Sequence, residues 1–296
     1  MTKLSSAFAP FLFIFFTVLV TACNNDSEAP TVLQLVSSTG QDYVSENRTV
    51  LGGTRVITGV YAQAPTENVS LTKFVVTFNH DSLDKQTPIV FLDSTLATDT
   101  KTFAMQVAYT PRNLANKEIW RFTITDSNSK TYQKEIRIKT TSTVNTAKSN
   151  YYTYTNVVLS RLKNPKKPFI DSTGLFGFAS ATGTSFPAYA VKQPGVATQI
   201  DLLFNDFRAQ KPSLSTVNSN TLVNTTLTTG RFDSITNVTM LTNAYPVNAP
   251  TVIKLENLKT NQVLAFKSVS NKVGLLRIVK AHKTLDSLTI NVKVEK

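Results

Sequence analysis

The sequence predicts an all-β protein, with an N-terminal β-sandwich followed by a second β-sandwich or a jelly-roll-like domain. From residue 31 onward, Val, Ile, Thr, Phe and Tyr alternate with polar residues in short runs, a pattern typical of strands that bury one face. Gly, Pro, Asn, Asp and Ser bound these runs and indicate turns. The sequence contains no long amphipathic helical pattern and no repeat of fixed period.

The first sandwich is expected over residues 31–140, in about seven strands. In Leu71–Phe78 the side chains of residues 74, 76 and 78 share an apolar face. Glu118–Thr125 and Tyr132–Ile138 flank the polar segment Asp126–Lys130, which predicts a hairpin. Further strands are expected at Val32–Val36, Arg55–Tyr61 and Thr102–Tyr109. The strand spacing and turn chemistry of this domain resemble those of the immunoglobulin-like domains that begin many Bacteroidota surface lipoproteins, although no pair of cysteines supports the comparison.

Residues 141–149 are rich in Thr and Ser and lack alternating apolar residues, so they are interpreted as a linker. An extended loop within one larger β structure is the alternative. The second domain is then expected over residues 150–296, with Ser213–Thr229 as a long polar loop. Its strand candidates are Tyr151–Leu159, Gly174–Phe178, Gln199–Phe204, Val252–Leu255, Val263–Phe266, Val273–Val279 and Ser287–Val294.

Residues 1–22 have the pattern of a bacterial secretion signal. Lys3 supplies the positive charge, and Phe11–Val20 is an apolar stretch too short to span a bilayer comfortably. Val20-Thr21-Ala22-Cys23 resembles the bacterial lipobox, which implies that Cys23 carries diacylglycerol and begins the mature chain. An ordinary buried cysteine is the alternative interpretation. Residues 23–30 are expected to form the lipidated tether, because they are polar and end in proline.

The resemblance to lipoproteins implies attachment to the cell outer membrane through the lipid on Cys23. Asn24 favours that membrane over the inner one in similar proteins, while Asp26 and Glu28 are a thin version of a surface-export signal. The surface-exposed and the periplasmic face of the membrane therefore both stay open.

Composition narrows the possible partners. The chain has 296 residues, 31 basic and 19 acidic side chains and a net charge of +12. Outside the cell, such a charge faces lipopolysaccharide phosphates, acidic glycans and phospholipid head groups, so no nucleic-acid partner is expected. A solvated basic surface without a dedicated partner is the plainer alternative. A single cysteine excludes an intramolecular disulfide.

Two groups of residues are candidate ligand-binding sites. Tyr151, Tyr152 and Tyr154 form an aromatic cluster that could stack on sugars if it is exposed. The alternative is a first strand in which Tyr152 and Tyr154 pack inward. The second group is a proline-bounded basic loop that could contact anions or simply be solvated. It contains Arg161, Lys163, Lys166 and Lys167.

Catalytic and metal-binding patterns are weak, so neither an enzyme nor a cofactor is expected. His80 and His282 are the two histidines, and both fall at predicted strand ends, where turn positions are the simpler interpretation. Asp201 and Asp206 flank one strand at an odd spacing, which places them on opposite faces and argues against a shared hydrolytic role. Without a Cys/His cluster, a zinc site is not expected.

Three tripeptides, Asp81-Ser82-Leu83, Asp233-Ser234-Ile235 and Asp286-Ser287-Leu288, resemble the short O-glycosylation pattern of Bacteroidota. The order of segments from 169 to 279 also resembles uncharacterised Bacteroidota outer-membrane lipoproteins. The main hypothesis is a non-catalytic envelope lipoprotein that binds a glycan or another anionic envelope component. The alternatives are a structural or assembly accessory that packs on a membrane protein partner, and a hydrolase with an unrecognised site.

Overall fold

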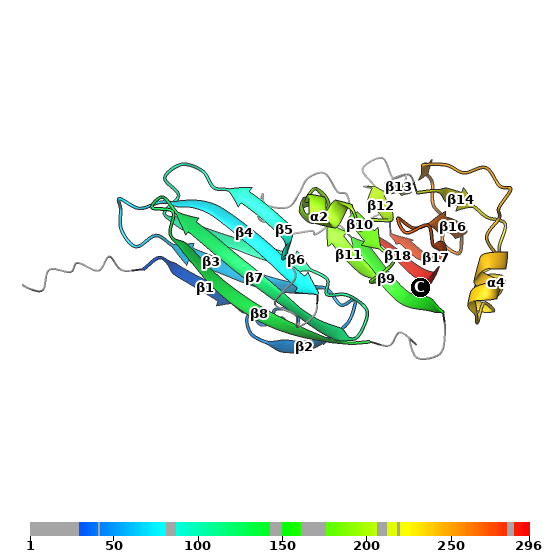
Figure 1. Ribbon diagram of the computed structural model, residues 1–296, viewed down its shortest axis with the longest axis horizontal. Coiled ribbons are helices and arrows are strands. Elements are labelled where there is room, and N and C mark those ends of the chain that lie inside the picture. Colours follow the sequence, from blue (N-terminus) through cyan, green and yellow to red (C-terminus); the bar gives the residue numbers. More distant parts are fainter. Residues whose placement is uncertain are drawn as a thin grey trace, which may run out of the picture. The chain divides into compact units, whose positions relative to one another are not determined.

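The computed structural model describes residues 30–40, 42–80, 87–142, 150–160, 176–205, 212–217, 220–282 and 287–296 (Figure 1). The chain divides into two compact units, residues 1–30 and 31–296. The expected secretion signal (residues 1–22) and Cys23 lie outside the described residues. The expected linker 141–149 also lies outside them, except for residues 141 and 142. Among the described segments, none is a helix of the length and hydrophobicity needed to cross a membrane.

The described strands in the first half of the 31–296 unit form two sheets. A three-stranded antiparallel sheet has the order β1-β3-β6, and a five-stranded sheet has the order β2-β8-β7-β4-β5. Their bounds are β1 Val32–Val36, β2 Arg48–Leu51, β3 Val56–Gln63, β4 Leu71–His80, β5 Ile89–Thr95, β6 Thr102–Tyr109, β7 Asn116–Asp126 and β8 Thr131–Thr141.

The side chains expected on the inner faces of these strands form one core. Phe74, Val76 and Phe78 of β4 are almost completely buried, as are the aligned apolar residues of β7 and β8. Trp120 stacks between Phe78 and Tyr109, with ring centroids 4.8 and 3.9 Å apart. Because large aromatic side chains bury the most apolar surface, this stack forms the centre of the first sandwich.

The described strands of the second half also form two sheets, with the orders β11-β10-β12-β13-β15 and β14-β16-β17-β18-β9. Apolar side chains from both sheets meet in one cluster, which makes a second β-sandwich. The strands are β9 Tyr151–Ser160, β10 Phe176–Ala179, β11 Thr184–Pro187, β12 Leu202–Asn205, β13 Ser213–Thr216, β14 Leu222–Asn224, β15 Lys254–Leu255, β16 Val263–Lys267, β17 Val273–His282 and β18 Ser287–Glu295. The prediction of an all-β protein with a second sandwich is confirmed.

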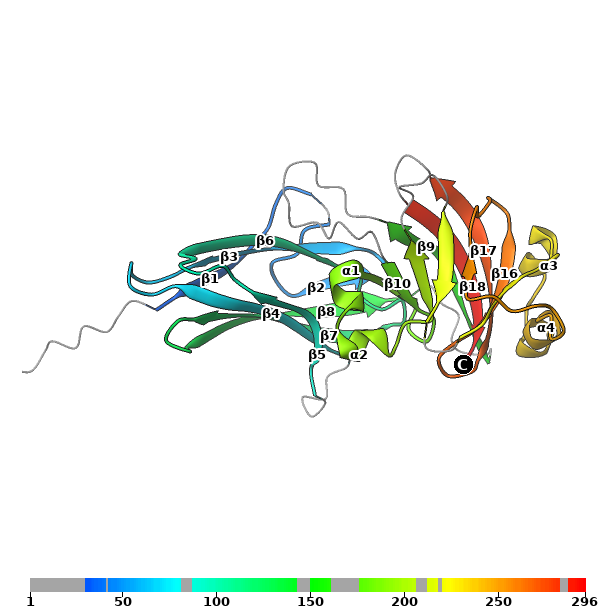
Figure 2. The ribbon, with the colours of Figure 1, turned by 90° about the horizontal axis from the view of Figure 1, so that it is seen from above.

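The described part of the second half also contains four short helices: α1 Ala188–Val191, α2 Pro194–Ala197, α3 Thr229–Asp233 and α4 Val238–Asn243. Side-chain oxygens of Thr228 and Asn237 cap α3 and α4 by accepting hydrogen bonds from the backbone N–H groups of Arg231 and Met240. In Figure 2, α3 and α4 lie beyond β16 and β17. There they cover an apolar face that includes Leu275 of β17.

The prediction of a long loop over Ser213–Thr229 was wrong. This segment contains β13 and β14, and the start of α3. Leu214 and Leu222 are fully buried in the second sandwich. Backbone pairing of β13 with β12, and of β14 with β16, therefore outweighs a composition of Ser, Thr and Asn that is typical of loops.

One buried lysine holds the helical cover in place. Lys293 of β18 is 7% exposed, and its Nζ donates hydrogen bonds to the carbonyl oxygens of Phe232 at 2.9 Å and Ile235 at 2.7 Å. The ammonium group also lies 5.0 Å from the centre of the Phe232 ring. A cation therefore satisfies the carbonyl groups at the C-terminal end of α3.

The β10–β11 hairpin and the two helices after it pack on the core of the first sandwich. Phe186, Ala190 and Ile200 belong to the same buried cluster as the strands of the first half. Gly183, in the turn between β10 and β11, has a φ of +65°. A Cβ atom there would lie 2.5 Å from the ring of Tyr154 and 2.9 Å from Asn113, so glycine allows this close approach.

We therefore expect Gly183→Ala to lower the free energy of unfolding by about 1–3 kcal/mol. The substitution combines a strained backbone with a collision against two buried neighbours. The matched control is Gly230→Ala in α3, where a Cβ atom meets nothing within 4 Å. That control is expected to raise stability by about 0.4–1 kcal/mol. Urea denaturation of both variants measures the difference, and equal effects would contradict this account.

Lys293→Met should destabilise the protein by about 1–3 kcal/mol, because the carbonyl groups at the end of α3 lose their donor while staying buried. Lys280→Met is the control, since Lys280 is an exposed residue of β17 in the same sheet. The control should change stability by no more than about 0.5 kcal/mol. Thermal unfolding followed by circular dichroism tests the pair, and a neutral Lys293→Met would rule out the capping role.

Candidate functional site

The three tyrosines of the predicted aromatic cluster lie at the start of β9. Tyr154 is fully buried in the second sandwich and Tyr151 is 9% exposed beneath the α3 and α4 cover, whereas Tyr152 is half-buried. Tyr152 and Tyr154 point the same way, with ring centroids 5.8 Å apart. Of the three, Tyr152 keeps partial exposure, and the Nζ of Lys296 lies 5.1 Å from the centre of its ring. An exposed platform of all three tyrosines does not exist in this fold.

Burial raises the pKa of the Tyr154 hydroxyl, and Tyr152 and Asp201 add to the effect. This hydroxyl makes no hydrogen bond within the described residues. The other predicted binding residues, Arg161, Lys163, Lys166 and Lys167, fall outside the described part of the chain, and so does Cys23. Those predictions stay predictions.

Asp201 has a structural environment rather than a catalytic one. It is 1% exposed, and its two carboxylate oxygens accept hydrogen bonds from the backbone N–H groups of Ser180 at 2.6 Å and Val269 at 2.7 Å. Burial raises the pKa of this carboxyl, while these hydrogen bonds act in the opposite direction. Asp206 lies outside the described residues.

The histidines also take positions at strand ends. His80 is the last residue of β4, and its Nδ1 lies 3.5 Å from Oε1 of the buried Glu118. His282 is the last residue of β17. No group of three or more His, Cys, Asp or Glu side chains in the described segments is arranged to hold a metal ion.

The serines of two of the three Asp-Ser tripeptides lie in the described part of the chain. Ser234 follows α3 and is exposed, with its hydroxyl donating to the carbonyl oxygen of Arg231 at 2.9 Å. Ser287 is 7% exposed at the start of β18, which leaves little room for a modifying sugar in the folded protein. Ser82 is outside the described residues.

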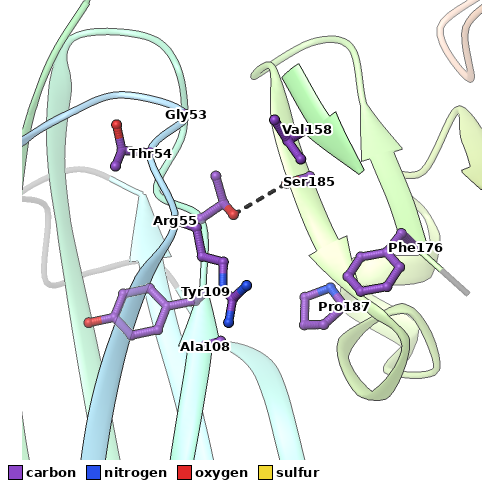
Figure 3. A pocket seen from close by; sticks show the side chains of 10 residues that line it. Gly53, Thr54, Arg55, Ala108, Tyr109, Val158, Phe176, Ser185 and Pro187 are labelled. Carbon is purple, nitrogen blue, oxygen red and sulfur yellow. Dashed lines mark hydrogen bonds between the residues drawn. The ribbon is translucent and has the colours of Figure 1, made fainter. Parts of the chain in front are cut away.

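A pocket of about 310 Å³ lies where the β10–β11 hairpin faces the first sandwich (Figure 3). One wall comes from the segment before β3 and the end of β6, and the other comes from β9, β10 and β11. The lining residues are Gly53, Thr54, Arg55, Ala108, Tyr109, Thr110, Val158, Phe176, Ser185 and Pro187. Its volume is within the range of small-molecule sites, about 300–1,000 Å³.

Direct contacts fix the two walls relative to each other. The Ser185 hydroxyl donates to the Thr110 hydroxyl at 3.2 Å, and the Tyr189 hydroxyl donates to the carbonyl oxygen of Ala108 at 2.6 Å. The backbone N–H of Asn113 donates to the carbonyl oxygen of Thr182 at 2.9 Å. These three hydrogen bonds connect the two halves of the unit. They therefore hold the two walls of the pocket in fixed positions.

Arg55 is the charged residue among the described residues that line this pocket. It precedes β3, is exposed, and extends between the two walls toward Pro187 (Figure 3). Its guanidinium makes no hydrogen bond or ion pair with any described residue. Loss of water lowers its pKa, while Tyr189, Asp42 and Tyr43 act in the opposite direction. An arginine side chain stays protonated in any case.

The pocket therefore offers a fixed positive charge beside apolar and aromatic surface. Phe176, Pro187 and Val158 supply the apolar contacts, while the Thr54 and Ser185 hydroxyls supply hydrogen-bonding groups. A guanidinium binds carboxylates and phosphates through two parallel N–H donors. The arrangement suits an anion attached to a ring or to another body with one apolar face.

Sequence patterns did not reveal this site. Its residues come from positions 53–55, 108–110, 158, 176 and 185–187, and only the packing of the hairpin brings them together. A second, more open and more polar hollow is lined by amide side chains that already bind one another. There, Nε2 of Gln262 donates to Oδ1 of Asn224 at 3.0 Å.

No protein-family model matches the chain, and no curated protein matches it either. Among solved structures, the chain is similar to a DUF4466 family protein from the Bacteroidota species Parabacteroides merdae. That match has 13% identity and a TM-score of 0.34, and covers 90% of this chain and 98% of the other. It is also similar to murine CRIg, with 9% identity and a TM-score of 0.24 over 38% of this chain and 99% of that one. TM-scores this low assign neither a fold nor a function.

Proposed function

We propose that this protein is a non-catalytic, lipid-anchored protein of the outer membrane whose pocket binds an acidic glycan unit. The observation that carries the proposal is the Arg55 guanidinium, which faces a pocket of about 310 Å³ and makes no hydrogen bond or ion pair with a described residue. A charge held in this way is free to pair with a ligand. The apolar wall around Phe176 and Pro187 excludes water from one side of the ligand, which strengthens that pairing.

An acidic sugar fits this chemistry better than a purely apolar ligand. Its carboxylate or phosphate would pair with Arg55, its hydroxyls would bond to Thr54 and Ser185, and its C–H face would lie on Phe176 or Pro187. Small-molecule sites commonly combine a mostly apolar lining with a few placed polar groups. The basic net charge of +12 would also attract anions to the protein as a whole.

The environment of Asp201 supports a non-catalytic role. A general acid or base needs a free oxygen directed toward a substrate, whereas both oxygens of Asp201 accept backbone hydrogen bonds. The carboxylate therefore joins the segment after β10 to the segment after β16. Replacing it would disrupt the second sandwich rather than a reaction.

Attachment to the membrane through Cys23 follows from the lipobox-like sequence. A lipid with two or more chains anchors stably, because each buried methylene group contributes about 0.8 kcal/mol. The tether 23–30 would then leave the folded unit, which begins at residue 31, close to the membrane. Both faces of the outer membrane remain compatible with this arrangement.

A protein partner is the second candidate function, and exposed apolar side chains favour it. Val247 is 81% exposed and Ile253 is 77% exposed, both on the segment between α4 and β15. Exposed apolar side chains mark protein interaction sites where they form a contiguous patch. Co-purification of one fixed membrane partner, lost on Val247→Ser with Ile253→Ser, would favour this role.

Arg55→Gln should weaken binding of glucuronate by about 10–100-fold, the range expected for loss of one hydrogen-bonded charge pair. Calorimetry on residues 24–296 without the lipid measures the affinity, with glucose as the uncharged matched ligand. Arg231→Gln is the control, because Arg231 is an exposed arginine of α3. Equal binding of glucose and glucuronate, or equal losses in both variants, would refute the assignment of the pocket.

Cys23→Ala should abolish labelling of the protein by radioactive palmitate in a bacterial host and move it from the membrane fraction to the soluble fraction. The physical reason is that the lipid supplies the whole of the membrane attachment. Protease treatment of intact cells then tells the two faces apart, since only surface-exposed protein is digested. Continued membrane attachment of an unlabelled Cys23→Ala protein would show that lipidation is not the anchor.

A further inference from the structure

On its strands β7 and β8, the outer face of the five-stranded sheet β2-β8-β7-β4-β5 carries more basic than acidic side chains among the described residues. Trp120 and Phe122 of β7, and Ile136 and Ile138 of β8, point into the core. The residues between them therefore point outward, because side chains alternate along a strand. On β7 and β8 this outer face includes Lys117, Arg121, Glu135, Arg137 and Lys139.

Lys117 and Lys139 are directly opposite each other in the antiparallel pairing of β7 with β8. Opposite residues in such a pair have Cβ atoms about 4.5–5.5 Å apart, and like charges there repel. Both lysines are exposed, and neither ammonium group makes a hydrogen bond or an ion pair with a described residue. Arg137 lies two positions from Lys139 on the same face.

The acidic side chains on this part of the sheet already form ion pairs with their neighbours. Glu135 lies between Arg121 at 3.2 Å and Arg137 at 2.9 Å. Asp93 of β5 pairs with Lys73 of β4 at 3.0 Å. The described residues of β7 and β8 therefore present four cations and one anion on this face, and the two unpaired cations are adjacent.

The uncharged residues of the same face indicate the kind of partner. Thr77, Thr123 and Gln133 present hydroxyl and amide groups, with Thr123 donating to the Gln133 side chain at 3.4 Å. Ile119 is 6% exposed, so it cannot insert into a bilayer. A sheet face of this composition suits an extended chain of hydroxylated, negatively charged units better than a lipid surface.

We propose that this outer sheet face docks an acidic polysaccharide, with Lys117 and Lys139 holding one of its anionic groups between them. An anion placed between two opposed ammonium groups replaces repulsion with two attractions. The rows of hydroxyl and amide groups bond to the sugar hydroxyls along the chain. This surface is separate from the Arg55 pocket and does not depend on it.

The test uses residues 24–296 without lipid and measures binding to immobilised polygalacturonate and to neutral dextran, at low and at high salt. The double variant Lys117→Glu with Lys139→Glu should weaken polygalacturonate binding at least about tenfold at low salt. Lys272→Glu with Lys280→Glu is the control. It makes the same change of charge at two exposed lysines around β17 and should retain most of the binding.

Three results would overturn the proposal. Equal losses in the two double variants would mean that net charge alone attracts the polymer. Equal binding of dextran and polygalacturonate would mean that charge is not recognised. Binding to phosphatidylglycerol vesicles that depends on Lys117 and Lys139, without binding to polygalacturonate, would assign the face to a membrane.

Two further measurements separate this proposal from unfolding and from the pocket. Lys117→Glu alone creates an opposite-charge pair with Lys139, so it should raise the melting temperature while weakening polymer binding. The lysine variants should leave glucuronate binding intact, because they do not alter the residues that line the Arg55 pocket. A polymer affinity that falls with Arg55→Gln and not with the lysine variants would place the polymer in the pocket instead.

Discussion

The rest of the structure depends on the packing of the β10–β11 hairpin against the first sandwich. Phe186 of β11 joins the core of the first half, with its ring centroid 6.4 Å from that of Phe78. Gly183 allows Tyr154 and Asn113 to approach the hairpin turn at distances that a side chain would prevent. Because apolar packing and hydrogen bonds both cross here, the two sandwiches share buried surface. The pocket walls are a consequence of that shared surface, since neither half contains the lining by itself.

Alternation predicted the fold well wherever a strand has one buried face and one wet face. In β4 and β7 the apolar positions read from the sequence are the ones that the core buries. The pattern carries less information where both faces are covered. All four residues of β10 and of β11 are buried, so these strands have no polar face to alternate with. The sequence did not predict β13 for a different reason. Three of its four residues are Ser or Thr, and Leu214 alone supplies a fully buried apolar side chain.

The candidate sites differ in how much of each could be predicted from the sequence. The sequence shows the adjacent tyrosines directly. Their burial, however, depends on which layers cover β9, and α3 and α4 cover the Tyr151 side. The Arg55 pocket joins segments more than a hundred residues apart and has no local signature. The pair of Lys117 and Lys139 is intermediate. Once the hairpin turn at Asp126–Lys130 is fixed, counting back along both strands places these two lysines opposite each other.

A comparison with the neighbouring acid on β7 explains why a partner for Lys117 and Lys139 is proposed from outside the protein. Glu118, the next residue after Lys117, faces inward and is 1% exposed. Its carboxylate accepts hydrogen bonds from the backbone N–H of Arg112 and from Nε1 of Trp120, both at 2.9 Å, so its charge is used within the fold. Lys117 and Lys139 have no such partner among the described residues, and their mutual repulsion opposes pairing of the strands that carry them. Folding alone would favour an acid at either position. An anion from outside the chain that lies between the two ammonium groups would replace this repulsion with two attractions.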